Sequence, residues 1–189
     1  MSPGTICDYM WIVFLVVWIV MALGTKTTQQ RESVSSRLSY TVFVAASFYL
    51  VFGRNTAVPW LRIPLFQPSA LSDWLGVALT AAGIGFAVWA RLYLGGNWSG
   101  AVTVKVGHEL VRTGPYRFVR HPIYTGLILA LLGTALVRAQ VRGLVAVVLI
   151  YVGFKIKSKI EERLMVATFG SAYDEYRRST GAIIPKLYS

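Results

Sequence analysis

Five runs of apolar residues, separated by short polar connections, constrain this chain more than any other feature of its sequence. A helix needs about 20 residues to cross a bilayer. The last two runs are joined only by Arg138-Ala139-Gln140, which predicts a tight helical hairpin that spans the membrane or enters it partway. We therefore expect an all-α integral membrane protein with about five transmembrane helices, the last two forming a short hairpin. The runs occupy residues 10–23, 38–52, 74–94, 123–137 and 141–156.

The charge content of the chain agrees with a membrane protein. Only 14% of its residues are charged, against about 25% in a soluble domain, so a soluble enzyme with one anchor is excluded. A net charge of +11 would by itself suit a nucleic-acid partner. The basic residues lie beside apolar runs, however, which is typical of anchors facing membrane lipids, and we expect no nucleic-acid partner. With Cys7 as the one cysteine and His108 and His121 as the two histidines, no metal site is expected.

The distribution of Lys and Arg predicts how the chain is oriented. With five spans, residues 24–39, residues 91–122 and the tail from Lys155 share one side, and they contain most of the basic residues. Basic loops stay on the cytoplasmic side. The N-terminus is therefore expected outside and the C-terminus inside, in the inner or plasma membrane of a prokaryote or the endoplasmic reticulum of a eukaryote.

A polar segment at residues 114–126 interrupts the apolar pattern. Ionisable groups at a membrane junction are costly and tend to mark functional sites. Pro122 suits the first turn of a helix, where its missing N–H costs nothing, and the free N–H groups of that helix end suit an anionic ligand. Tyr116 and Tyr124 offer flat faces to an adenine ring or a sulfonium. Taken singly, Arg117 and Arg120 are more typical of interfacial anchors.

A second polar group, Glu161-Glu162, follows the last apolar run and three lysines. Alone, the pair is typical of a solvated helix face that forms ion pairs with Lys157 and Lys159. Either carboxylate could also accept hydrogen bonds from ribose hydroxyls or an amine. Together with the segment 114–126, the pair would suit a zwitterionic nucleoside cofactor, bound on the cytoplasmic side.

These residues also form an ordered set of motifs. The central motif is Arg120-His121-Pro122-x-Tyr124-x-Gly126, followed by Glu161-Glu162. Before it stands His108-x-Leu110-Val111-x-x-Gly114-x-Tyr116, and after it Phe169-Gly170-x-x-Tyr173-x-x-Tyr176, then Thr180 and Ile184-Pro185. Over about residues 95–186 the pattern resembles the isoprenylcysteine carboxyl methyltransferase family and the related phospholipid methyltransferases.

The resemblance implies a membrane methyltransferase that uses S-adenosyl-L-methionine. It divides the chain into transmembrane helices at 1–94 and a catalytic, cofactor-binding region at 95–189. It implies a basic substrate contact near Lys157, at a position where the family has Arg. We expect catalytic roles for Arg120, His121 and Glu162 and a substrate contact for Arg117, since Arg117 and Arg120 are candidates to steer an anionic acceptor or hold a lipid phosphate. The resemblance also implies cofactor contacts at His108, Glu109, Leu110, Val111, Tyr116, His121, Pro122, Ile123, Tyr124, Glu161 and Glu162.

Three functions remain open at this point. The first is methylation of a carboxylate on an isoprenylcysteine-like or other lipophilic or lipidated acceptor, which needs no general base because the carboxylate is already ionised. The second is methylation of a phospholipid or amine, for which Glu161, Glu162 or His121 would act as base. The third is a non-enzymatic transport or scaffold protein, which would bind no cofactor and tolerate Glu162→Gln. A membrane reductase is disfavoured because no G-x-G-x-x-G fingerprint follows a strand.

Overall fold

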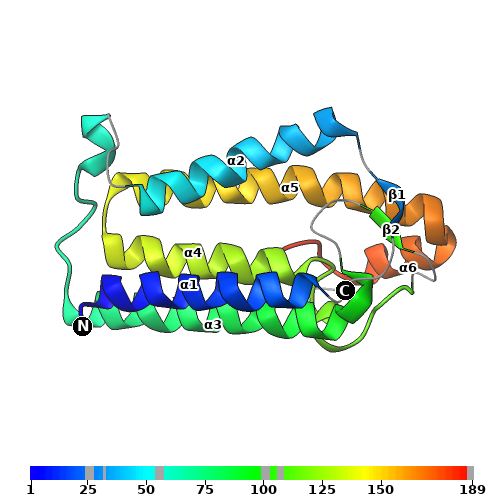
Figure 1. The fold of residues 1–189 in the computed structure, drawn as a ribbon, viewed down its shortest axis with the longest axis horizontal. Coiled ribbons are helices and arrows are strands. Elements are labelled where there is room, and N and C mark those ends of the chain that lie inside the picture. The colour runs from blue at the N-terminus through cyan, green and yellow to red at the C-terminus, as the bar shows by residue number, and fades with distance from the viewer. Residues whose placement is uncertain (24–27, 32, 54–57, 99–102, 106–108, 187–189) are drawn as a thin grey trace.

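Long helices make up most of the fold. The computed structural model describes residues 1–23, 28–31, 33–53, 58–98, 103–105 and 109–186. Figure 1 shows the long helices lying side by side, with α6 and two short strands at one end and residues 58–69 at the other. The helices are α1 (Pro3–Ala22), α2 (Val34–Phe52), α3 (Ala70–Leu94), α4 (Pro122–Arg138), α5 (Val141–Phe169) and α6 (Ser171–Ser179).

The helix ends follow ordinary capping chemistry. The Ser69 side chain caps α3 in a reciprocal pair with Ser72, which satisfies donors that a helix start leaves free. Gly170 has φ 55° and separates α5 from α6, a conformation that favours glycine. The Phe169-Gly170 step of the ordered motifs is therefore the end of α5. Three short 3₁₀ turns complete the helical elements, at Pro59–Arg62, Gly95–Asn97 and Gly114–Arg117.

Helices α3 and α4 pack so closely that their backbones touch. A Cβ atom added to Gly83 would lie 2.4 Å from the Ala130 nitrogen, and one added to Gly133 would lie 2.5 Å from the Gly76 oxygen. Small residues at helix contacts permit this approach in membrane proteins. The contact fixes the start of α4, and with it the polar segment before it, against the end of α3.

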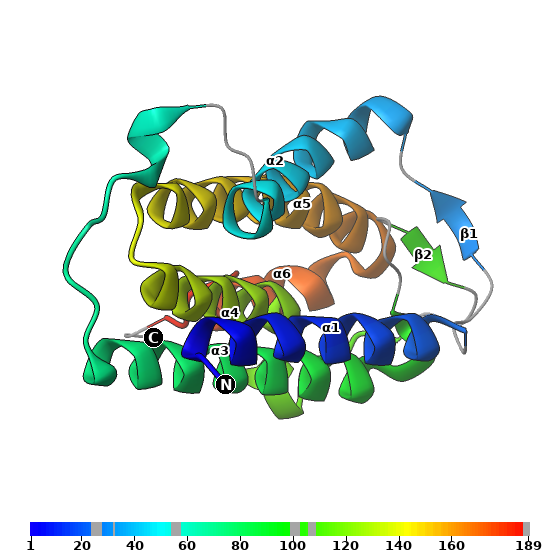
Figure 2. The same ribbon diagram turned by 60° about the vertical axis from the view of Figure 1, so that its left-hand side comes forward.

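The predicted hairpin of α4 and α5 is present. Its turn is made by Ala139, which adopts a left-handed conformation with φ 51°, and by Gln140. The loop before α3 covers this turn, since Leu65 N–H donates to the Ala139 oxygen at 2.8 Å and Val141 N–H donates to the Ile63 oxygen at 3.0 Å. Helix α5 then runs well past its apolar part, so Glu161 and Glu162 lie at the opposite end, beside α6 (Figure 2).

The all-α membrane architecture is confirmed. Helices α1, α2 and α3 are each long and apolar enough to cross a bilayer, while α4 is apolar but shorter. The total of five spans therefore stays a prediction. The antiparallel strands β1 (Thr28–Arg31) and β2 (Thr103–Lys105) have no local signal in the sequence, because they are too short and polar to give an alternating apolar pattern.

Candidate functional site

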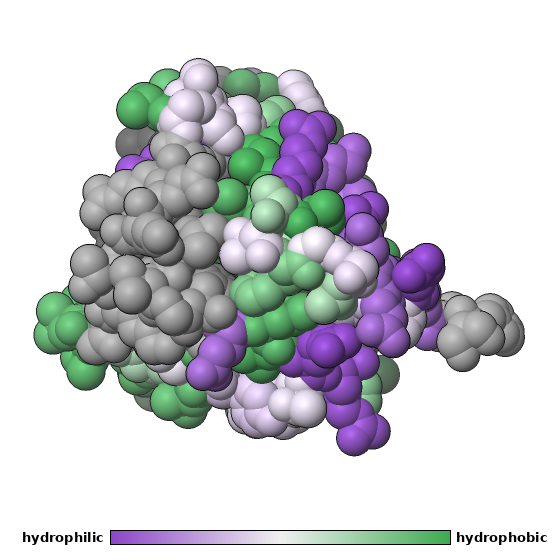
Figure 3. Space-filling view, turned by 90° about the vertical axis from the view of Figure 1, so that its right-hand side faces the viewer, coloured by the Kyte–Doolittle hydropathy of each residue, from purple (hydrophilic) through white to green (hydrophobic). Residues whose placement is uncertain are grey.

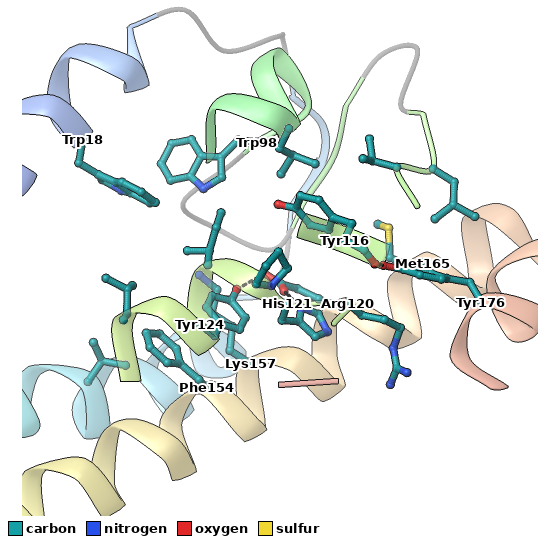
Figure 4. Close-up of a pocket in the computed structure, with 18 of the residues that line it drawn as sticks. Trp18, Trp98, Tyr116, Arg120, His121, Tyr124, Phe154, Lys157, Met165 and Tyr176 are labelled. Carbon is teal, nitrogen blue, oxygen red and sulfur yellow. Dashed lines mark hydrogen bonds and ion pairs between the residues drawn. The ribbon is translucent and has the colours of Figure 1, made fainter. Parts of the chain in front are cut away.

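A cavity of about 370 Å³ lies between the helices at the end of the molecule that carries α6. Figure 4 shows its walls, which come from both halves of the chain. One end is polar and is built from residues 109–124 and the second half of α5. The other end is apolar and is built from α1, α2, the first half of α4 and the middle of α5.

His121 organises the polar end. Its Nδ1 lies 3.2 Å from Glu161 Oε2, and its Nε2 lies 3.2 Å from Glu162 Oε1. The ring therefore bridges two neighbouring carboxylates on α5 from its position just before α4. The backbone N–H of His121 donates to the Ala182 oxygen at 2.9 Å, so the C-terminal segment holds the histidine in place.

Arg120 ties the other carboxylate to the C-terminal segment. Its Nε and Nη2 donate to Glu162 Oε1 at 2.9 and 2.6 Å, and Nη1 donates to the carbonyl oxygens of Thr180 and Arg177. The Arg120 side chain is only 8% exposed and the Glu162 side chain 15%. A charge-assisted pair this sheltered from water holds its geometry better than a surface pair.

The two glutamates have different surroundings. The Tyr124 hydroxyl donates to Glu161 Oε1 at 2.6 Å, and Glu161 lines the cavity. Glu162 is not among the described residues that line it; its partners are Arg120, His121 and, at 3.9 Å, Arg177. Adjacent residues on a helix point about 100° apart. Glu161 therefore faces the cavity, while Glu162 lies behind it and supports Arg120 and His121.

The charges of this cluster stabilise one another. Burial alone would lower the pKa of His121, but the hydrogen bonds and charges of Glu161 and Glu162 outweigh it and raise that pKa above its ordinary value. Burial alone would raise the pKa of Glu162, but His121 and Arg120 together lower it to about 2. The pKa of Glu161 is also lowered, against its burial, by His121 and the charge of Lys157. The cluster therefore favours a protonated imidazole between two ionised carboxylates.

Aromatic rings surround the polar end. Tyr124 stacks on His121 at 5.4 Å and on Phe154 at 4.4 Å between ring centroids. Tyr116 lines the cavity on the other side (Figure 4), and its backbone oxygen accepts a hydrogen bond from the Tyr176 hydroxyl at 2.5 Å. Burial raises the pKa of Tyr116 far above its ordinary value. These tyrosines therefore stay neutral and act as walls and hydrogen-bond donors.

Lys157 marks the border between the two ends of the cavity. Its side chain is buried, and its ammonium lies 5.2 Å from the centroid of the Tyr40 ring and 5.4 Å from that of Tyr124. An ammonium over aromatic faces is stabilised by their negative quadrupole. A positive charge is thereby held where polar lining gives way to apolar lining, as Figure 4 shows.

The apolar end is largely aromatic. Phe14 and Trp18 come from α1, Phe48 from α2, and Trp98 from the segment after α3. Trp18 and Trp98 meet edge to face at 5.3 Å. Trp98 is in turn held by the guanidinium of Arg91, which lies 4.2 Å from the centroid of the Trp98 ring.

Most of the predicted site residues converge on this cavity. Arg120, His121, Tyr116, Lys157 and Glu161 line it, and so do Glu109, Leu110, Val111, Pro122, Ile123 and Tyr124. Arg117 is exposed and lies over the ring of Phe118, and it is not among the described residues that line the cavity. His108 lies outside the described residues, so its predicted role stays a prediction.

Sequence reasoning missed the part of the cavity that comes from α1 and α2. Trp18, Val44 and Phe48 look like ordinary residues of a membrane span, and no spacing sets them apart. Tyr173 and Tyr176 carried a signal, because they belong to the ordered motifs and lie three residues apart, at helical spacing. Both are buried and line the cavity.

Comparisons with known proteins agree with this arrangement. The structure resembles that of the eukaryotic intramembrane Ras methyltransferase ICMT, an isoprenylcysteine carboxyl methyltransferase. The TM-score is 0.59 at 24% identity, with 79% of this chain and 53% of that chain covered. The similarity supports a shared membrane fold.

Two curated relatives illustrate the sequence similarity. Methanethiol S-methyltransferase 1 of Bradyrhizobium diazoefficiens is 27% identical over 92% of this chain and 64% of its own length. The protein-S-isoprenylcysteine O-methyltransferase of Schizosaccharomyces pombe is 33% identical over 42% of this chain and 34% of its own. The chain thus spans less than two thirds of the length of these relatives. A model of the family described as phospholipid methyltransferase matches residues 71–172, more than half of the chain, and the protein therefore belongs to that family.

Proposed function

We propose that this protein is an integral membrane methyltransferase that uses S-adenosyl-L-methionine to methylate a carboxylate on a lipophilic, isoprenylcysteine-like acceptor. One observation carries the proposal: a single cavity joins a charged end, with His121 and Glu161, to an aromatic, apolar end between α1 and α2. Such an enzyme must bring a charged nucleoside cofactor into contact with an apolar acceptor, and the two ends offer those two environments.

The polar end has groups that suit the cofactor. The Glu161 carboxylate suits ribose hydroxyls or the amino group. At the start of α4 the N–H groups of Tyr124 and Thr125 donate to the His121 oxygen and Pro122 has none, so the N–H of Ile123 is the donor that suits the cofactor carboxylate. Because Tyr124 already stacks on His121 and Phe154, we assign the ring-facing role to Tyr116. When bound, the cofactor supplies an activated methyl group on sulfur. We retain the other predicted cofactor contacts as proposals, with Glu161 as the direct contact and Glu162 as its support.

The position of Lys157 supports a carboxylate acceptor. Its buried ammonium lies where the apolar lining begins, so it would pair with a carboxylate whose tail extends toward α1 and α2. An acceptor carboxylate is ionised at neutral pH and needs no base. The chain then has to orient the nucleophile and exclude water, which can contribute about 7–11 kcal/mol to the rate.

The state of His121 disfavours an amine acceptor. A protonated amine must lose its proton before it can attack, and this requires a general base. Both ring nitrogens of His121 lie against carboxylates, and its raised pKa favours the protonated form. The lowered pKa of Glu161 and Glu162 makes them weak bases. The amine or phospholipid N-methyltransferase therefore ranks second to carboxylate methylation.

A thiol acceptor is the candidate that the comparisons favour beside these two. The methanethiol S-methyltransferase relative aligns with 92% of this chain. A one-carbon thiol would leave the aromatic end formed by Phe14, Trp18 and Phe48 without a role, so we rank a lipophilic acceptor above it.

We also propose that the site faces the cytoplasm. The basic tail and the segment before α4 lie at the same end of the molecule as the polar end of the cavity (Figure 1), and basic loops are retained on the cytoplasmic side. S-adenosyl-L-methionine dissolved in the cytosol would then reach the polar end directly.

Transfer of a labelled methyl group in nanodiscs tests the proposed function. Four acceptors are offered in parallel: a farnesylcysteine-type carboxylate, its methyl ester, phosphatidylethanolamine and methanethiol. We expect product from the free carboxylate only. Lys157→Met should lower kcat/KM for that acceptor by about tenfold or more, because about one charge-assisted contact is lost, while the affinity for the cofactor stays near that of the wild type.

Lys159→Met is the matched control, since Lys159 is exposed on the same helix and does not line the cavity. Equal losses of kcat/KM in the two variants would mean that Lys157 does not contact the acceptor. Transfer to phosphatidylethanolamine or methanethiol but not to the carboxylate would mean that the acceptor is an amine or a thiol instead. Folded protein that transfers no methyl group and binds no cofactor would favour a transport or scaffold role.

A further inference from the structure

A second hollow, of about 680 Å³, lies on the outer side of Arg120. Arg120 forms part of its wall and also part of the wall of the cavity described above. Its lining has five basic side chains and one acidic one, together with Ser171, Gly181 and Ala182. We call it the basic groove, and its charged residues are Arg120, Lys155, Asp174, Arg177, Arg178 and Lys186.

Some of these charges have partners within the protein. Arg120 and Lys186 both donate to the carbonyl oxygen of Arg177, at 3.2 and 3.3 Å. Cations at the C-terminal end of a helix such as α6 are favoured by the exposed carbonyls there. Arg177 lies 3.4 Å from Asp174 and 3.9 Å from Glu162, which also pairs with Arg120. These contacts explain why α6 and the C-terminal segment are basic, but the groove as a whole keeps an excess of positive charge.

Lys155 and Arg178 supply much of that excess. They are exposed, they come from different helices, and neither has an acidic partner within ion-pair distance among the described residues. Like charges gathered in one hollow repel each other, and a multivalent oxygen anion between them would turn this repulsion into charge-assisted hydrogen bonds.

The place of the groove along the helices indicates which anion it meets. Lys155 is the first cation after the apolar part of α5, which runs from residue 143 to 154. That is the level at which a spanning helix passes the lipid headgroups. Figure 3 views this end of the molecule and shows hydrophilic side chains gathered along one side, next to an apolar area.

We propose that the basic groove binds a phosphate group, carried by an anionic phospholipid headgroup or by a soluble phosphate ester. Lys155 and Arg178 would contact the phosphate oxygens, and Arg120 would connect the occupied groove to the wall of the first cavity. This site is separate from the proposed methyl transfer, because binding in the groove requires neither cofactor nor acceptor.

Thermal unfolding in neutral detergent micelles tests the groove. The protein is titrated with phosphatidylglycerol, with phosphatidylcholine, and with glycerol 3-phosphate, which has the phosphate without acyl chains. We expect a saturable rise in Tm with phosphatidylglycerol, because a ligand that binds only the folded state stabilises it. Lys155→Gln with Arg178→Gln should lower the apparent affinity about thirtyfold, which corresponds to about 2 kcal/mol.

Lys159→Gln with Arg163→Gln is the matched control, since both residues are exposed on α5, lie outside the groove and carry the same total charge. This variant should keep the wild-type midpoint. Equal losses of affinity in the two double variants would overturn the proposal. So would a rise in Tm with phosphatidylcholine equal to that with phosphatidylglycerol, or no saturable rise with either phosphatidylglycerol or glycerol 3-phosphate. A response to glycerol 3-phosphate that depends on Lys155 and Arg178 would support phosphate binding and identify the source as soluble. A response to phosphatidylglycerol alone would identify it as the lipid.

Discussion

At the scale of single residues, Glu161 and Glu162 show what the sequence predicts and what it leaves open. The motif places both near a cofactor, but no spacing rule says which one faces it. The structure separates them by their partners: Tyr124 binds Glu161, and Arg120 binds Glu162. Their helix could present either residue to the cavity, and the choice depends on the packing of α5 against α4.

The strongly lowered pKa of Glu162 predicts an acid-sensitive fold. A carboxylate with a pKa of about 2 in the folded state and 4.5 otherwise stabilises the fold fully above 4.5 and loses that contribution as the pH falls toward 2. His121 is protonated in both states across this range, so its contribution stays constant. Thermal unfolding in detergent from about pH 6 to about pH 3 should show Tm falling.

Glu162→Gln removes one of the two carboxylates with a lowered pKa and leaves Glu161, so this variant should start from a lower Tm at neutral pH and lose less on acidification. Glu175→Gln is the control. Glu175 is exposed, and its ion-pair partner Arg112, at 3.7 Å, is exposed as well. A Glu162→Gln variant with the same acid slope as the wild type would mean that another carboxylate carries the effect.

At the scale of elements, the sequence predicted the apolar helices and the hairpin because their signals are local. Long apolar runs and the glycine at 170 each indicate a structure without reference to the rest of the chain. The strands β1 and β2 pair across more than seventy residues of sequence, between Thr28 and Lys105, and short polar strands give no local signal. The closeness of α3 and α4 is likewise a property of two helices together.

That closeness predicts a sharp contrast between two glycines on α3. Gly83→Ala would place a methyl group 2.4 Å from the Ala130 nitrogen, whereas Gly85→Ala meets nothing within 4 Å. The first change should destabilise the protein by about 1–3 kcal/mol through overpacking. The second should be neutral or slightly stabilising, because alanine favours a helix over glycine by about 1 kcal/mol.

Thermal unfolding of the two variants in the same detergent measures this contrast. Equal stability of Gly83→Ala and Gly85→Ala would mean that α3 and α4 are farther apart than the structure has them.

At the scale of the whole molecule, the cavity joins both halves of the chain. The sequence motifs identified only its C-terminal half, because the polar residues there stand out against apolar surroundings. Phe14, Trp18 and Phe48 reach the cavity only through the packing of α1 and α2 around α4 and α5. The proposed division at residue 94 stays a prediction, although the cavity has contributions from both sides of it.

The proposed orientation of the molecule predicts which end is accessible from outside the cell. Gln67, in the loop before α3, and Ala167, in the last turn of α5, are exposed, and Cys7 is fully buried. Figure 2 shows the start of α3 and the end of α5 at opposite ends of the molecule. In a Cys7→Ser background, an impermeant maleimide should label Gln67→Cys in intact cells. It should label Ala167→Cys only after permeabilisation, because the basic end faces the cytoplasm. The reverse labelling pattern would place the site outside.

The central claim is that the polar end of the cavity binds S-adenosyl-L-methionine through Glu161. Calorimetric titration of the folded protein in detergent tests it most directly. The account predicts binding by the wild type, a loss of about tenfold or more in Glu161→Gln because a buried carboxylate contact is removed, and wild-type affinity in Glu175→Gln. The contradicting result is no binding by folded wild-type protein at about 1 mM cofactor. The binding free energy would then be weaker than about −4 kcal/mol.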